Sequence, residues 1–217
     1  MNSKWSELNK QMQLMLKKRD TYKDGIAALC ELREDLFRTL TEIRQDLPEK
    51  SLSAMPCPKA KGYHNKTVAY SIWHIFRIED IVANTIIANS EQILFSGDYL
   101  SKTRSNIITT GNELTGEEIV SFSESLDIDA LYEYAKAVRE STEKLLGSLA
   151  FDKLKIKVSR EAKQRVIQSE CVSSHENAVW LIDYWCGKDI RGLVQMPFSR
   201  HWIMHTEAIL RIADKLK

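Results

Sequence analysis

The chain has 217 residues, of which 43% are hydrophobic and 28% charged, and its 31 Lys and Arg nearly balance its 30 Asp and Glu. This length suits one domain with a sizeable hydrophobic core. The near-neutral charge excludes a whole-chain field that would attract nucleic acid or an anionic membrane, so neither partner is expected. With only 8 Gly and 4 Pro, the chain is too poor in turn residues for an all-β fold, and an all-α fold is favoured.

The sequence carries no pattern typical of export or membrane insertion. The first ten residues, MNSKWSELNK, lack the apolar segment of a secretory signal, and no run of about 18 uncharged apolar residues occurs. The four cysteines form no CxxC pair. We therefore expect a cytoplasmic protein whose reduced thiols mostly pack as small hydrophobic residues.

The first third of the chain divides into an arm, a helix and a loop. Residues 1–20 form an amphipathic arm whose apolar side needs a surface to cover, either its own helices or a partner subunit. Residues 21–46 repeat leucine and isoleucine at helical spacing, which predicts a long helix. Residues 47–66 hold three of the four prolines and no clear apolar period, which indicates a long loop that lines or covers something. The folded domain is expected to span 21–217.

Further helices follow, joined by connections of varying length. Residues 67–89 are apolar almost all round, as in a helix buried on several sides. Residues 128–149 are amphipathic, and the last helix is expected to begin near Pro197. Weaker local signals are the capping-box patterns Thr115–Glu118 and Ser173–Glu176, a helix end at Gly187 and an alternation at 151–158 of the kind found in a short extended stretch.

Three histidines are the most informative residues. His201 and His205 are four residues apart, so on a helix their imidazoles share one face, one turn apart. His74 lies in the apolar segment 67–89. Two histidines from one helix and one from another can occupy three positions around a divalent ion and leave the others open. The alternative is that they are core histidines bonded to backbone carbonyls, and the pattern alone leaves both interpretations open.

Two longer motifs surround these histidines. The segment AYSIWHIFRIEDI contains His74, and WLIDYWCGKDIRGLVQMPFSRHWIMHTEAILRI contains His201 and His205. Together they resemble the DinB-like (DinB/YfiT) superfamily, in which a central helix carries WHIxRIED-like text and the final helix carries RHxxxHxxEA-like text. The resemblance covers the chain from about residue 21 to the end and leaves the arm at 1–20 outside it.

The resemblance implies a four-helix bundle with up-down-down-up connectivity, here with an extra N-terminal helical arm. It also implies a divalent metal site with His74, His201 and His205 as ligands. Members of the superfamily bind nickel, zinc, iron or manganese and commonly form homodimers. Some relatives are thiol-dependent transferases or isomerases that use bacillithiol, mycothiol or a similar low-molecular-weight thiol.

Two functions of different classes are therefore expected. One is a metal-dependent enzyme, a small-thiol S-transferase or hydrolase acting on a small-molecule substrate. The other is a non-catalytic metal- or ligand-binding protein of the stress-response kind. No partner nucleophile, general-base dyad or phosphate-binding loop in the sequence decides between them.

Several acidic residues are candidates to orient the ligands. A ligating imidazole usually donates its other N–H to a carboxylate or a carbonyl. Glu79 and Glu207 are the first candidates for this role, and Asp183 is a further one. Asp80 is expected instead to form an ordinary ion pair with Arg77.

The remaining histidines and the nearby aromatic residues are weaker candidates. His64 lies in the proline-rich loop and could approach the open face of the metal, but a solvated position is favoured. His175 falls in the first turn of a helix, where a structural role is expected. The candidate walls of a pocket are Tyr63, Tyr70, Trp73 and Trp202.

Overall fold

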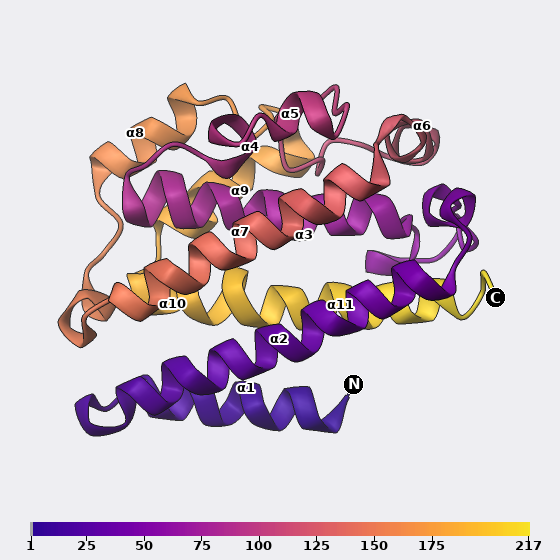
Figure 1. Ribbon diagram of the computed structural model, residues 1–217. Helices are drawn as coiled ribbons and strands as arrows, with labels where there is room; N and C mark the ends of the chain where they lie inside the picture. Colours follow the sequence, from indigo (N-terminus) through magenta and orange to yellow (C-terminus); the bar gives the residue numbers. More distant parts are fainter. Residues whose placement is uncertain (1) are drawn as a thin grey trace.

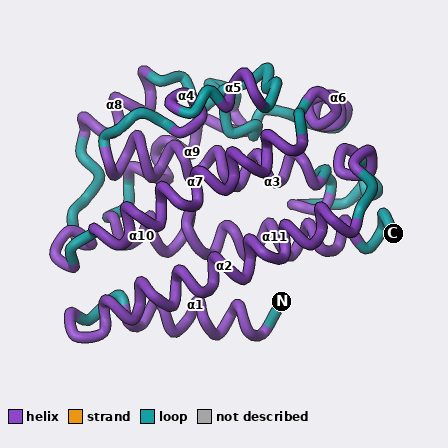
Figure 2. Tube along the Cα trace, in the orientation of Figure 1, coloured by secondary structure: helices purple, strands orange, loops and turns teal. Residues whose placement is uncertain are grey.

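The computed structural model describes residues 2–217, and every regular element in this part of the chain is a helix (Figures 1 and 2). The only paired extended residues in 2–217 are those of an isolated antiparallel bridge between Lys157 and Asp189. The expected all-α class is confirmed. Over the same range, no helix combines the length and the apolar character that crossing a membrane requires. The α-helices are α1 Ser3–Met15, α2 Tyr22–Asp46, α3 Val68–Asp80, α4 Ile93–Ser96, α5 Tyr99–Lys102, α6 Glu117–Ser125, α7 Ile128–Ser148, α8 Arg160–Gln168, α9 Glu176–Cys186, α10 Ile190–Gln195 and α11 His201–Ala213.

The helix α3 lies at the centre of the molecule. It packs against α7 on one side and α11 on another, while α2 contacts both α7 and α11 (Figure 1). Every residue of α3 is buried, as its nearly continuous apolar sequence predicts. A side chain of α3 therefore faces other helices in almost any direction, and its polar groups need partners inside the protein.

The N-terminal arm covers its own chain. Helix α1 lies along α2, with Trp5 and Met12 buried between them. The indole Nε1 of Trp5 donates a hydrogen bond to Asp35 on α2 at 2.9 Å. Gly25 allows the close approach at the end of α1, because a Cβ atom there would lie 3.0 Å from the Cβ of Met15. Of the two expected surfaces for the arm, its own helices are the one observed.

Two long helices contain π-helical segments that the sequence analysis does not anticipate. The helix α3 continues as a π-helix over Ile81–Ala88. The final helix begins at Ile190, not near Pro197, and Pro197 lies inside a π-helical segment, Met196–Arg200. Proline lacks a donor N–H and crowds the preceding turn. A widened turn accommodates it, and α11 follows without a break in the helix.

The predicted helix starts are only partly confirmed. The Glu118 carboxylate accepts a hydrogen bond from the backbone N–H of Thr115 at 2.9 Å, which is half of a capping box. The box predicted at Ser173 is wrong, because α9 is capped by His175, whose Nδ1 accepts from the N–H of Asn177. Gly187 ends α9 as expected. Residues 151–158 form a short 3₁₀-helix, Phe151–Lys155, before the bridge at Lys157.

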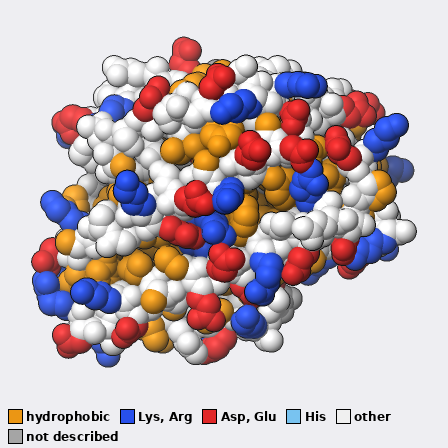
Figure 3. Space-filling view, viewed as in Figure 1, with side chains coloured by type: hydrophobic (Ala, Val, Ile, Leu, Met, Phe, Trp, Pro, Cys, Tyr) orange, Lys and Arg blue, Asp and Glu red, His pale blue; other side chains and the backbone are white. Residues whose placement is uncertain are grey.

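The surface agrees with the balanced composition. On the face shown in Figure 3, acidic and basic side chains are mixed, and neither sign dominates the face. Small apolar areas lie between them. This mixture on the visible face fits the formal net charge of +1.

Candidate metal centre

The helices α3 and α11 bring the three histidines together in the interior. Each of His74, His201 and His205 offers one ring nitrogen, and these three atoms lie within 4.8 Å of one another. All three side chains are buried. His74 comes from the middle of α3, and the two others come from the first two turns of α11, the helix that packs against it.

The spacing of the nitrogens fits a shared ion. The Nε2 atoms of His74 and His201 are 3.2 Å apart. Two nitrogens bound tetrahedrally to one zinc ion at its usual bond length would be about 3.3 Å apart. The ring centroids of the three histidines are separated by 4.4 to 5.1 Å, and the ring planes are tilted rather than stacked. This arrangement suits ligands that converge on one point.

A backbone carbonyl sets the tautomer of His74. Its Nδ1 lies 2.9 Å from the carbonyl oxygen of Thr110. A carbonyl oxygen only accepts hydrogen bonds, so Nδ1 must carry the proton. The lone pair is then on Nε2, the atom that faces His201, and this is the arrangement that a metal ligand requires.

The same face of α3 holds the loop that supplies this carbonyl. Three further side chains share this side of α3 with His74, because helical residues three, four or seven positions apart lie on one face. They are Tyr70, Trp73 and Arg77. They donate hydrogen bonds to the backbone carbonyls of Gly111, Thr109 and Ile108 at 2.9, 3.0 and 2.8 Å, respectively. Together with His74, they bind four consecutive carbonyls of one loop. The loop position is thereby fixed relative to the His74 ring.

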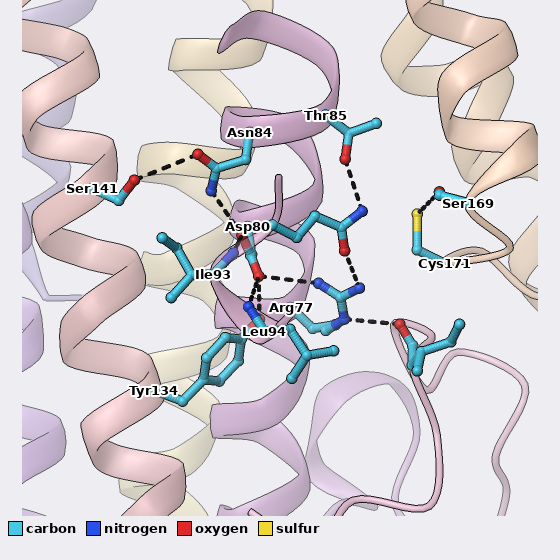
Figure 4. Close-up of polar contacts among 12 residues, drawn as sticks. Arg77, Asp80, Asn84, Thr85, Ile93, Leu94, Tyr134, Ser141, Ser169 and Cys171 are labelled. Atoms are coloured by element: carbon cyan, nitrogen blue, oxygen red, sulfur yellow. Dashed lines mark hydrogen bonds and ion pairs between the residues drawn. The ribbon is translucent and has the colours of Figure 1, made fainter. Parts of the chain in front are cut away.

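A buried polar network anchors the start of this loop (Figure 4). The Asp80 carboxylate accepts hydrogen bonds from the backbone N–H groups of Ile93 and Leu94 at 2.8 and 3.0 Å. It also accepts from Tyr134 of α7 at 2.9 Å and pairs with Arg77 at 3.2 Å. The expected Asp80–Arg77 ion pair is therefore confirmed. Asp80 therefore fixes the segment of chain that leads from α3 to the loop carbonyls at 108–111.

Within the described range 2–217, His201 and His205 have no comparable carboxylate or carbonyl partner. The Nδ1 atom of His201 is buried and has no hydrogen-bond partner among residues 2–217. The His205 ring packs against the ring of Tyr63, with centroids 4.5 Å apart. Tyr63 comes from the proline-rich loop, which confirms that this loop covers part of the site.

The electrostatics keep all three imidazoles neutral. Burial lowers the pKa of His74 to about 4, although the hydrogen bond to Thr110 opposes the shift. Burial lowers the pKa values of His201 and His205 well below the usual value; His74 lowers that of His201 further, and both other histidines lower that of His205. The ammonium group of Lys66 also lowers the pKa values of His74 and His205. Neutral imidazole is the form that binds a metal ion.

The acidic candidates have other partners. Both oxygens of Glu79 are bonded to the guanidinium of Arg33 at 2.7 and 2.8 Å, and one also accepts from the Trp202 indole at 2.7 Å. Glu207 accepts from the backbone N–H of Asn2, and Asp183 pairs with a surface lysine. None of these carboxylates is hydrogen-bonded to a histidine of the cluster. The Thr110 carbonyl has the role that was expected of them, and a backbone group leaves no signal in the sequence.

The other two histidines lie outside the cluster. The Nε2 of His64 accepts a hydrogen bond from Arg211 at 3.0 Å on the surface, and His175 caps α9. Among the aromatic candidates, Tyr63 lines the cavity described below and Tyr70 stacks on His74. Trp73 and Trp202 are fully buried core residues that do not line it.

A cavity of about 290 Å³ opens onto the three histidines. Its wall comes from Tyr63, from the loop residue Asn112, from α3 and α9 and from the π-helical segment at Met196. The contribution of α9 could not be predicted from the sequence, because its aromatic residues have the spacing of ordinary core positions. The residues of α9 that line the cavity are Trp180, Leu181, Tyr184 and Trp185.

Comparison with known proteins supports the fold. The structure is similar to the crystal structure of a conserved protein from Enterococcus faecalis, with a TM-score of 0.54. The match covers 87% of this chain and 94% of that chain at 16% sequence identity. At such low identity the likeness concerns the fold alone. No family model matches the sequence, and no curated protein matches it.

Proposed function

We propose that this protein binds one divalent metal ion through His74, His201 and His205 and that it belongs to the DinB-like superfamily. The observation that carries the proposal is the convergence of three buried ring nitrogens within 4.8 Å. The 3.2 Å separation of two Nε2 atoms and the fixed tautomer of His74 support it. In this proposal α2, α3, α7 and the final helix are the up-down-down-up bundle, and α1 is an added arm.

We propose further that the protein is a metal-dependent enzyme, an S-transferase for small thiols or a hydrolase. A divalent ion held by three neutral imidazoles acts as a Lewis acid with open coordination positions. The residues of this chain supply the ligands, exclude bulk water from them and leave one side open to the cavity of about 290 Å³. Imidazole ligands suit nickel, zinc and iron, whereas manganese is better matched by oxygen ligands.

The alternative is a non-catalytic metal- or ligand-binding protein, and one observation favours it. Among residues 2–217, the cavity wall contains no carboxylate, lysine or cysteine side chain. Such groups are common general acids, bases and nucleophiles. A screen of electrophiles with several low-molecular-weight thiols separates the two functions. Turnover that disappears on metal removal supports the enzyme, whereas a loss of thermal stability on metal removal without any turnover supports the alternative.

The metal site is tested by replacing one ligand. His201→Ala should remove stoichiometric metal from protein purified without an affinity tag, because two imidazoles hold a divalent ion far more weakly than three. Elemental analysis gives the readout. His64→Ala is the matched control, since His64 is bonded to Arg211 on the surface and should leave metal content unchanged. Equal metal content in wild type and His201→Ala would refute the assignment.

A further inference from the structure

The wall of the cavity is mainly apolar, whereas the three histidines at its base are polar. Apart from those histidines, its residues are aromatic or aliphatic, with Asn112 as the one amide. The aromatic residues at its edge are unusually exposed, with Trp180 at 50%, Tyr63 at 40% and Tyr184 at 37%. Large exposed aromatic side chains around a concave site are typical of ligand-binding surfaces.

The edge formed by α9 is also held in place. The Trp180 indole donates a hydrogen bond to the backbone carbonyl of Asn177 at 2.9 Å. Trp180 and Tyr184 pack edge to face with centroids 5.7 Å apart, and the ammonium of Lys188 lies 3.9 Å from the centroid of the Tyr184 ring. An apolar ligand would therefore meet a surface that already has its shape, which lowers the entropic cost of binding.

The charge around the proposed ion is not balanced by the protein. Three neutral imidazoles leave the ion with its full charge of 2+. The candidate acid Glu79 is already paired with Arg33, and no acid lines the cavity in 2–217. The half-buried Lys66 ammonium adds positive charge near His74 and His205. A buried charge without a counter-charge is costly, and this favours an anionic group at the open positions of the ion.

We infer that the cavity binds a small ligand with one anionic metal-binding head, such as a thiolate, and an uncharged aromatic or aliphatic body. This inference rests on the proposed metal function and adds the class of substrate. The head offsets the charge at the three histidines, and the body lies against Trp180, Tyr184 and Tyr63. A thiol with further charged groups brings those groups against a wall that itself carries no charged side chain within 2–217.

Three probes separate the head from the body. Phenylmethanethiol carries both, benzyl alcohol carries the same ring without the anionic head, and 2-mercaptoethanesulfonate carries the head on a charged body. Each is titrated calorimetrically into the untagged, metal-containing protein in oxygen-free buffer. We expect phenylmethanethiol to bind at least about tenfold more tightly than either of the others. Equal or tighter binding of 2-mercaptoethanesulfonate would overturn the inference.

Variants of α9 test the wall. Trp180→Ala should weaken phenylmethanethiol binding by about tenfold, because it removes a large apolar contact, and should leave metal content unchanged. Val179→Ala is the matched control, since Val179 is also exposed on α9 but does not line this cavity. Metal content is measured on every sample. Absence of metal from the wild type would contradict the proposed function, whereas full metal content with no effect of Trp180→Ala would contradict the inference alone.

Discussion

At the scale of single residues, the burial of charge explains much of the arrangement around the histidines. Arg33 and Glu79 are both fully buried and form a bidentate pair between α2 and α3. The guanidinium also stacks over the Trp202 ring, 4.5 Å from its centroid. Trp202 follows His201 directly on α11. The pair therefore links α2, α3 and α11 next to a proposed ligand.

Removing one member of this pair should be more harmful than removing both. Glu79→Gln replaces an acceptor oxygen by an amide that faces Arg33 or Trp202, and leaves the Arg33 charge with only the longer contact to the half-buried Glu143. We expect the free energy of unfolding to fall by about 3 kcal/mol. The double variant Arg33→Met, Glu79→Met should recover most of this loss, because it removes both charges. Urea denaturation of the three proteins measures the difference.

Glu143→Gln is a control for the effect of charge alone. Glu143 is half-buried and lies 3.7 Å from the Arg33 Nε. Its neutralisation should cost less than about 1 kcal/mol, as for other partly exposed pairs. A Glu79→Gln protein as stable as the wild type would show that the buried pair contributes nothing to the packing of the three helices.

At the scale of elements, apolar periodicity predicts the helices well and their irregularities poorly. The predicted helices at 21–46 and 128–149 are observed as Tyr22–Asp46 and Ile128–Ser148. Each of these helices has a charged outer face and a single apolar side. This pattern determines which side of the helix faces the core. The π-helical turn at Pro197 has no such signature, because a π-turn changes hydrogen bonding without changing the residue pattern.

The candidate site shows the same division. The three histidines could be selected from their spacing and their apolar surroundings, and the structure brings them together. The wall residue Trp180 could not be selected, because exposed and core aromatic residues have the same spacing on a helix. The Thr110 carbonyl could not be selected either, because every residue has one. What the sequence does not contain is the position of a loop relative to a helix.

The loop that carries Thr110 should depend on Asp80. One Asp80 oxygen accepts from Leu94, Tyr134 and Arg77, and the other accepts from Ile93. Asp80→Asn replaces one of these two oxygens by an amide group that donates. We expect a loss of about 3 kcal/mol in the free energy of unfolding. Amide hydrogen exchange should accelerate across residues 93–110, and metal affinity should fall because the partner of His74 is less well fixed.

Glu91→Gln is the matched control in the same segment. Glu91 is exposed and lies just before the residues that Asp80 binds, so its neutralisation should change neither exchange nor metal affinity. If Asp80→Asn lowered stability but left exchange in 93–110 unchanged, the carboxylate would be a general core contact and not an anchor for this loop.

At the scale of the whole molecule, the three-histidine cluster joins the buried helix α3 to the final helix α11. The imidazoles of this cluster resist protonation. A metal ion bound there would add to the stability of the folded state alone, because the unfolded chain separates the three ligands. In the metal-free protein, the same three imidazoles lower the stability of the folded state. Three imidazoles held neutral in the interior oppose folding whenever the solution favours their charged form.

Metal-free protein should therefore lose stability as the pH falls from about 6.5 towards 4. An unfolded histidine has a pKa of about 6.5, and burial lowers the folded pKa of His74 to about 4. Between these values the unfolded chain binds a proton that the folded chain does not, so the stability present above pH 6.5 is lost as the pH decreases. His74 alone contributes on the order of 3 kcal/mol to this loss, and the lowered pKa values of His201 and His205 add to it.

The measurement is the free energy of unfolding of chelator-treated protein at intervals between pH 7.5 and 4.5. His205→Leu removes one group whose pKa is lowered and should flatten the dependence on pH, and His64→Ala is the matched control for the loss of a histidine outside the cluster. Comparing slopes rather than absolute stabilities removes the effect of the substitution on packing. It also cancels the contribution of Glu143, whose pKa is raised by burial and which therefore acts with the opposite sign. Identical slopes in all three proteins would mean that the histidine cluster is not the group that titrates.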